Sequence, residues 1–121
     1  MRRDSTRLED VLKSADQIER FLRDSTREHF LGDEILQAAV LQKLLVIGEA
    51  TSRITRRFRS SHPEIEWQEV IAFRNFAIHA YFNLEWSVVW TTSTVDVPVL
   101  RQKVAALLSQ PGLFGSDTTD G

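Results

Sequence analysis

The segment from Arg74 to Tyr81 gathers the polar groups of this 121-residue chain that could perform phosphate chemistry. It holds Arg74, Asn75, His79 and Tyr81 in an otherwise apolar stretch. An imidazole titrates near neutral pH and can move protons, whereas a guanidinium can hold two phosphate oxygens. The pair therefore suits metal-independent cleavage of RNA, in which the ribose 2'-hydroxyl attacks its own phosphate.

The spacing of these residues sets conditions on the site. On an ideal helix Asn75 and His79 lie about 40° apart and share a face, whereas Arg74 lies about 140° from His79. Arg74 can reach the site through its long side chain or from a second subunit. Tyr81 joins the group only if the helix ends near His79.

A structural role is also compatible with the same residues. In that interpretation His79 is a hydrogen-bonded core histidine and Arg74 is the ion-pair partner of Glu69 or Glu49. Tyr81 is then a core aromatic residue whose hydroxyl reaches water. Spacing alone leaves both interpretations open.

A second candidate site is the arginine-rich stretch from residue 53 to residue 59. Its cations could hold an RNA backbone or an anionic partner. They could equally be a solvated cluster that is stabilised by the carboxyl end of a helix dipole. The arginines concerned are Arg53, Arg56, Arg57 and Arg59.

Other kinds of catalytic site find no support in the sequence. Cysteine is absent, which excludes disulfides, thiolate zinc ligands and cysteine nucleophiles. We find no glycine-rich phosphate loop, no His-Glu-x-x-His and no Gly-x-Ser-x-Gly, so we expect no metal and no cofactor. The two remaining histidines, His29 and His62, fall in predicted breaks without polar neighbours.

Composition indicates one globular domain. Hydrophobic residues make up 42% and charged residues 26% of the chain, and the net charge is -2. Residues 1–60 carry 12 Lys and Arg against 10 Asp and Glu, whereas the remainder carries 3 against 7, so the halves are +2 and -4. The longest apolar run, Leu44 to Gly48, is far short of the roughly 20 residues of a membrane span. We expect a cytoplasmic protein without a secretory signal or membrane segment.

Apolar residues recur at intervals of three and four over most of the chain, which predicts an all-α bundle of four or five helices in up-and-down order. Asp4 or Ser5 is the expected cap of the first helix, and Asp33 of the second. The β-branched segment 91–97 would be a strand without a partner, so we reject a strand there. The predicted helices cover residues 5–23, 34–59, 67–79, 84–90 and 98–108, and a disordered tail covers 109–121.

The predicted second helix, residues 34–59, is apolar on more than one side and therefore needs more than one packing partner. The third predicted helix shows the same pattern. Because a bundle of this size offers few partners, we expect a homodimer. Gly48, in the interior of the second helix, suggests a close approach by another helix.

Residues 74–81 resemble the Arg-x4-His-x-Tyr motif of the HepT toxins, which belong to the HEPN superfamily. The similarity extends over residues 4–108 in an ordered series of flanking blocks. These blocks are 8–18, 39–50 with Ile47-Gly48-Glu49-Ala50, 63–67, 81–82, 89–90 and 97–100.

The resemblance implies an all-α fold and a two-fold homodimer in which both motifs face a shared cleft. It also implies a toxin that cleaves RNA without metal and is paired with a separately encoded minimal nucleotidyltransferase antitoxin. Tyr81 resembles the tyrosine to which such antitoxins attach AMP in some members.

The residue roles follow as a hypothesis. His79 acts as general base or acid, Arg74 stabilises the phosphorane, and Asn75 orients His79 or the phosphate. The two-fold axis would supply a second His79, which separates the acid from the base. The rival hypothesis is a non-catalytic module that binds a nucleotide or the antitoxin in the same cleft.

Overall fold

The computed structural model describes residues 3–114, and this part of the chain is helical without any β-strand. The all-α prediction is therefore confirmed. The elements are α1 (Asp4–Leu22), α2 (Arg27–Leu31), α3 (Glu34–Ser52), α4 (Arg56–Ser61), α5 (Trp67–His79), the 3-10 turn η1 (Tyr81–Asn83), α6 (Trp86–Thr91), the π-helical segment η2 (Thr92–Asp96) and α7 (Val97–Leu108).

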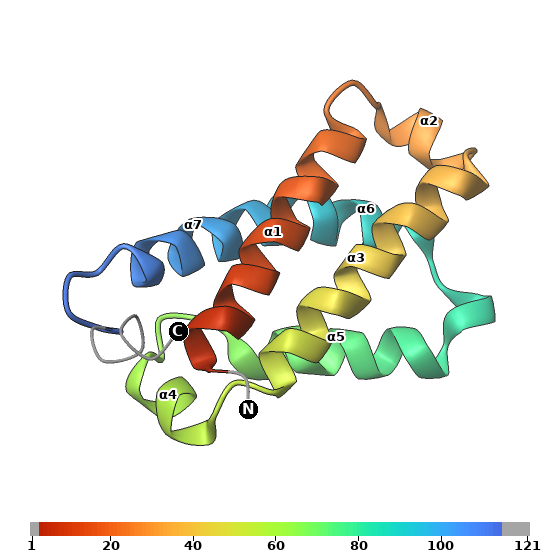
Figure 1. The fold of residues 1–121 in the computed structure, drawn as a ribbon. Helices are drawn as coiled ribbons and strands as arrows, with labels where there is room; N and C mark the ends of the chain where they lie inside the picture. Colours follow the sequence, from red (N-terminus) through yellow and green to blue (C-terminus); the bar gives the residue numbers. More distant parts are fainter. Residues whose placement is uncertain (1–2, 115–121) are drawn as a thin grey trace.

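The four long helices form two pairs that cross (Figure 1). Helices α1 and α3 lie side by side with opposite chain directions, and α5 and α7 cross them obliquely. Helix α5 packs on α3, whereas α7 packs on α1. The bundle is thus not a set of four aligned helices, and α5 and α7 remain apart.

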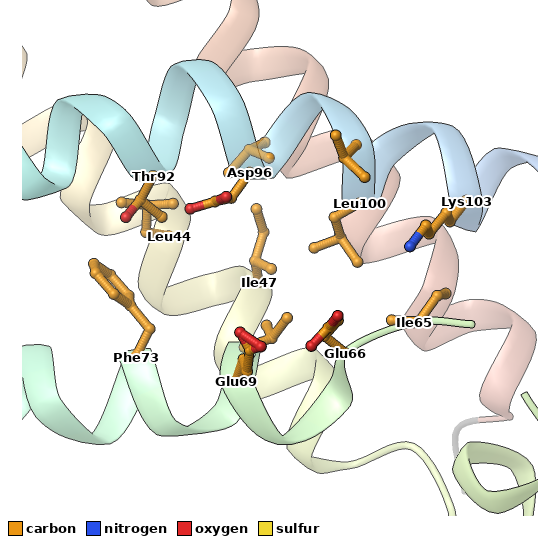
Figure 2. Close-up of a pocket in the computed structure, with 13 residues that line it drawn as sticks. Leu44, Ile47, Ile65, Glu66, Glu69, Phe73, Thr92, Asp96, Leu100 and Lys103 are labelled. Carbon is orange, nitrogen blue, oxygen red and sulfur yellow. The ribbon is translucent and has the colours of Figure 1, made fainter. Parts of the chain in front are cut away.

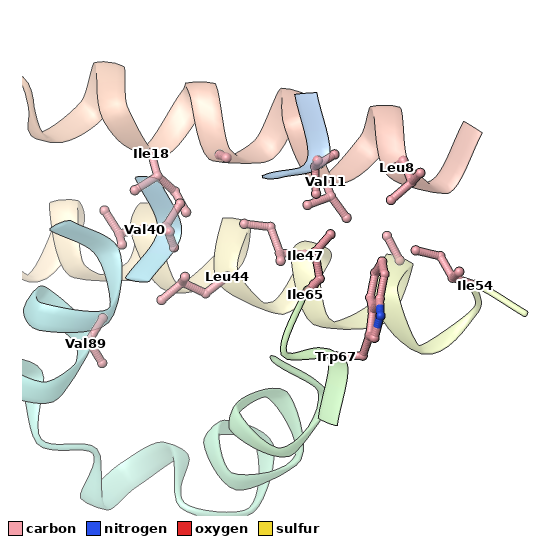
Figure 3. Close-up of a cluster of buried hydrophobic side chains, with 14 of the residues drawn as sticks. Leu8, Val11, Ile18, Val40, Leu44, Ile47, Ile54, Ile65, Trp67 and Val89 are labelled. Carbon is pink, nitrogen blue, oxygen red and sulfur yellow. The ribbon is translucent and has the colours of Figure 1, made fainter. Parts of the chain in front are cut away.

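The core lies where these helices meet (Figure 3). Leu8, Val11 and Ile18 of α1 face Val40, Leu44 and Ile47 of α3 across it. All six side chains are at most 4% exposed. Removal of such surface from water, about 25 cal/mol per Å², is the main force that holds the bundle together.

Helix α3 is the one described helix that is long and apolar enough to cross a membrane by length and composition. Its mean hydropathy reaches 1.2, and 44% of its most apolar stretch is buried. No membrane-spanning segment is predicted from the sequence, because that prediction considers only unbroken apolar runs. Contacts of α3 with both α1 and α5 account for its apolar character as that of a central core helix.

The predicted helix over residues 34–59 is wrong beyond Ser52, because α3 ends there and a separate helix, α4, begins at Arg56. Thr55 caps α4 by accepting a hydrogen bond from the Phe58 amide. The carboxylate of Asp4 accepts bonds from the Thr55 amide at 2.9 Å and the Thr55 hydroxyl at 2.7 Å. Asp4 therefore stabilises the corner between α3 and α4 and does not cap α1, whose N-cap residue is Arg3.

Other boundaries differ in smaller ways. Residues 27–31, expected within a break, form α2, where Thr26 caps the helix and Phe30 is fully buried. Asp33 is confirmed as the cap of the second predicted helix, because its side chain accepts a hydrogen bond from the Leu36 amide in the first turn of α3. Residues 92–96 continue the helix from α6 into α7 as a π-helical segment, so the rejection of a strand there is confirmed.

The expected disordered tail begins at residue 109, but residues 109–114 are described as turns. Leu113 and Phe114 pack against the core, and the Phe114 ring stacks on Phe58 with centroids 5.6 Å apart. These apolar side chains hold residues 109–114 against the helices. Residues 115–121 lie outside the described residues.

Candidate functional site

The motif arginine lies where α5 touches α3. Arg74 packs its Cβ and Cγ against Gly48, so closely that a Cβ on Gly48 would lie 2.6 Å from the Cγ and nearer still to the Cβ. The suggestion of a close helix approach at Gly48 is therefore confirmed. Glycine is the residue that leaves room for Arg74 to run along the surface of α3.

Gly48→Ala should displace Arg74 and destabilise the protein by about 1–3 kcal/mol, because the new methyl group overlaps a packed side chain. Urea unfolding measures the effect. Gly32→Ala is the matched control, since a Cβ there meets nothing closer than 3.9 Å. Equal stability of Gly48→Ala and wild type would contradict the close approach.

The guanidinium of Arg74 is held by two acceptors. Its Nη2 donates to Glu49 Oε1 at 2.7 Å, and its Nη1 donates to the side-chain oxygen of Asn75 at 3.0 Å. Of the two partners considered from sequence, Glu49 is the one that pairs with Arg74. Asn75 contacts Arg74, so these two motif residues are directly linked.

Glu49 also binds a second arginine. Arg53 Nε donates to Glu49 Oε2 at 2.8 Å, so one carboxylate joins Arg53 to Arg74. The hydrogen bond from Arg53, with attraction from both arginines, lowers the pKa of Glu49. Glu49 therefore carries its negative charge at neutral pH.

His79 is the last residue of α5 and is exposed. It follows Asn75 by four residues, so both lie on one face of α5. Among the described contacts no hydrogen bond or ion pair joins His79 to Arg74. The core-histidine interpretation does not fit an exposed side chain, and Arg74 connects to the His79 face through Asn75.

Tyr81 stands just past the end of α5, in η1. The condition for its joining the motif, a helix end near His79, is met. Its side chain is 47% exposed and its ring contacts Phe82 edge to face, with centroids 5.4 Å apart. A tyrosine with this exposure is not a core aromatic, so that interpretation does not hold for Tyr81.

The end of α5 and η1 expose large apolar side chains around His79. Phe76 is 56% exposed, Ile78 46% and Phe82 95%. Soluble proteins rarely leave such groups clustered in water. Helix α3 packs on both α1 and α5, and its most exposed large apolar residue is Ile35, near its start.

The four arginines expected to act as one cluster have different surroundings. Arg53 pairs with Glu49, whereas Arg56 and Arg57 are exposed in the first turn of α4. Arg59 is half-buried and its Nε has no hydrogen-bond partner. The alternative that a helix carboxyl end stabilises these cations is wrong for Arg56 and Arg57, because they lie at the amino end of α4, where cations are disfavoured.

The cleft between α5 and η2–α7 has a different character (Figure 2). It encloses about 420 Å³, with apolar walls that include Leu44, Ile47 and Phe73. Glu66, Glu69 and Asp96 supply negative charge, and Lys103 the single cation of the lining. A hydrogen bond with Glu66 and repulsion by Glu66 and Asp96 raise the pKa of Glu69. This cleft repels phosphate, so it is not where an RNA backbone would bind.

The remaining histidines lie away from the motif residues. His29 of α2 lies 3.1 Å from Asp33, the N-cap residue of α3, and His62 lies 3.5 Å from Glu64. The residue that sequence reasoning missed as part of the site is Glu49, which it considered only as a structural partner. The sequence held a signal for Glu49, because this residue belongs to the Ile47-Gly48-Glu49-Ala50 block that carries part of the family resemblance.

Known proteins resemble this chain over most of its length. A family described as "Ribonuclease HepT-like" matches residues 11–107, which include every residue of the Arg74–Tyr81 motif. The curated protein "Probable ribonuclease HepT" of Thermococcus cleftensis is 41% identical over 100 residues, which are 83% of this chain and 91% of that protein.

Two further relatives carry similar names. A protein of Methanocaldococcus jannaschii that is named a putative RNase is 33% identical over 97 residues, which are 80% of this chain and 89% of that protein. Another putative RNase, of Caldanaerobacter subterraneus, is 28% identical over 103 residues, which are 85% of this chain and 92% of that protein. No solved structure matches significantly.

Proposed function

The chain belongs to the HepT-like ribonuclease family, and from this premise we propose that it is a metal-independent endoribonuclease of the cytoplasm. The observation that carries the proposal is the Glu49-bridged pair of Arg53 and Arg74, together with Asn75, which binds Arg74 and shares a face of α5 with the exposed His79. Cations and an accessible imidazole can together supply phosphate binding and proton transfer.

In the proposed reaction the ribose 2'-hydroxyl attacks the adjacent phosphorus and the bond to the 5'-oxygen breaks. One imidazole, His79, removes the proton from the 2'-hydroxyl, and a protonated imidazole returns one to the leaving 5'-oxygen. Arg74 stabilises the negative charge of the phosphorane, and Asn75 orients Arg74 against it. The products are a 2',3'-cyclic phosphate and a 5'-hydroxyl end.

One imidazole cannot serve as base and acid in the same step, so the proposal includes a two-fold homodimer. The exposed apolar side chains of Phe76, Ile78 and Phe82, which are close to His79 in the chain, support this, because a second copy that covered any of them would bring a second His79 close. Light scattering at micromolar concentration should give twice the monomer mass. A stable monomer would contradict the shared site.

The exposed arginines of α4, which lies near the amino end of α5, are proposed to bind the RNA backbone away from His79 (Figure 1). Arg56→Gln with Arg57→Gln should weaken RNA binding and reduce the slope of log Kd against log salt by about one for each phosphate that the variant no longer neutralises. Arg20→Gln with Arg27→Gln removes the same charge from the far end of α1 and from α2 (Figure 1). Equal effects of the two double variants would leave α4 without a specific role.

We further propose that the protein is the toxin of a pair whose antitoxin is a minimal nucleotidyltransferase encoded separately. The exposure of Tyr81, two residues past His79, supports AMP transfer to its hydroxyl. An added AMP group brings negative charge and bulk to the place that RNA phosphate would occupy, so cleavage stops.

Cleavage of RNA by the purified protein in the presence of EDTA tests the proposed activity. Activity that survives EDTA supports the metal-independent reaction. RNA or nucleotide binding without any cleavage would instead support the rival function, a binding module that works with a nucleotidyltransferase.

A further inference from the structure

Two arginines from different helical contexts meet on a single carboxylate. Arg74 comes from α5 and Arg53 from the C-cap of α3, and each donates to a different oxygen of Glu49. Without Glu49 the two guanidinium groups would repel each other. The carboxylate therefore keeps the two positive charges adjacent and leaves a net charge of +1 across the three groups.

The hydrogen bonds of this pair leave most of the arginine donors available. A guanidinium offers five N–H donors. Arg53 uses Nε for Glu49, which leaves both of its Nη groups uncommitted in the described contacts. Arg74 uses one bond at each Nη, so donors remain there as well. The side chains of Arg53 and Arg74 are 56% and 31% exposed, so a phosphate can approach them.

The pairing differs from an ion pair that occupies a guanidinium edge. On α1, Arg23 donates to Glu19 through both Nε and Nη2, at 3.0 Å and 2.5 Å, which consumes the edge that a phosphate would take. Glu49 instead meets each of its arginines through one nitrogen. This geometry fits a carboxylate that positions the arginines and does not fit one that masks them.

We propose that Glu49 is a positioning residue that holds Arg53 and Arg74 as a two-arginine clamp for one RNA phosphate. The clamp rests on the proposed nuclease function and adds to it a second phosphate-binding arginine and the group that places both. Glu49 itself does not touch the substrate. Its effect on cleavage passes through the two guanidinium groups.

Kinetics of Glu49→Gln test the clamp. Glutamine keeps the shape of the side chain but loses the charge that holds both arginines, so kcat should fall by about 10- to 100-fold through misplacement. KM should change little, because the net positive charge of the surface increases. Glu19→Gln, which breaks the edge-on pair of α1, should stay within about twofold of wild type.

A double variant separates positioning from a general loss of stability. If Glu49 acts through its arginines, Arg53→Gln should cost much less in a Glu49→Gln background than in wild type. Circular dichroism should show unchanged helix content in both. Wild-type or higher kcat in Glu49→Gln would overturn the clamp, since higher activity is the mark of a masking carboxylate.

Binding of an RNA with 2'-O-methyl groups at every ribose, which cannot cleave itself, tests the clamp without catalysis. The losses in affinity from Arg53→Gln and Arg74→Gln should be non-additive in wild type and additive in the Glu49→Gln background. Additive losses in both backgrounds would overturn the clamp.

The two assays together separate failure of the clamp from failure of the nuclease. Wild-type cleavage with an unaffected Glu49→Gln variant overturns the clamp and leaves the proposed function in place. No cleavage but coupled binding overturns the nuclease and supports the clamp. The absence of both overturns both.

Discussion

His79→Ala is expected to lower kcat for RNA cleavage by about 10²- to 10⁴-fold, the usual contribution of a positioned acid or base. His79 is exposed at the end of α5, so its loss should leave the core intact. In a dimer with two such imidazoles, every site loses both its base and its acid. Initial rates of cleavage of a labelled RNA measure the effect.

The control for this prediction is His29→Ala, which removes an exposed histidine that pairs with Asp33 on α2. It should keep wild-type activity. Helix content and dimer mass of His79→Ala should match wild type, which shows that the loss is chemical. Unfolding of His79→Ala, or retention of most activity, would remove this residue from the mechanism.

Tyr81→Phe is expected to abolish modification by a cognate nucleotidyltransferase. The tyrosine hydroxyl attacks the α-phosphorus of ATP and pyrophosphate leaves, a reaction that phenylalanine cannot undergo. Tyr81 is the only tyrosine in the chain and its side chain is 47% exposed. Loss of the hydroxyl should not disturb the fold, because the ring can keep its contact with Phe82.

Mass spectrometry of the intact protein after co-expression with the nucleotidyltransferase measures this prediction. Wild type should gain mass in units of AMP and lose nuclease activity, whereas Tyr81→Phe should gain none and stay active. Wild type expressed alone provides the unmodified reference. Equal modification of both proteins would place the acceptor elsewhere.

The elements predicted best from sequence are those with a regular apolar stripe. The helices predicted over residues 5–23 and 67–79 match α1 and α5 to within one residue at each end. The helix over 34–59 failed because Ile54 and Phe58 continue the apolar spacing through the break. At the break Thr55 caps α4 and bonds to Asp4, which is 51 residues away in the chain, so this contact is invisible to local periodicity.

The candidate site was predictable in its motif but not in its contacts. The spacing of Asn75 and His79 placed them on one face of a helix. Helix α5 ends at His79, which is the condition under which Tyr81 joins the motif. The bonds of Glu49 to Arg53 and Arg74 depend on how α3 meets α5, which Gly48 permits. Only the tertiary structure reveals that the arginine stretch and the motif share a carboxylate.

The ends of the RNA fragments that the purified protein produces in EDTA test the central claim most directly. Attack by the 2'-hydroxyl, assisted by His79 and stabilised by Arg74, predicts 2',3'-cyclic phosphate and 5'-hydroxyl ends at undiminished rate. Fragments with 3'-hydroxyl ends, or cleavage that EDTA abolishes, would contradict the account.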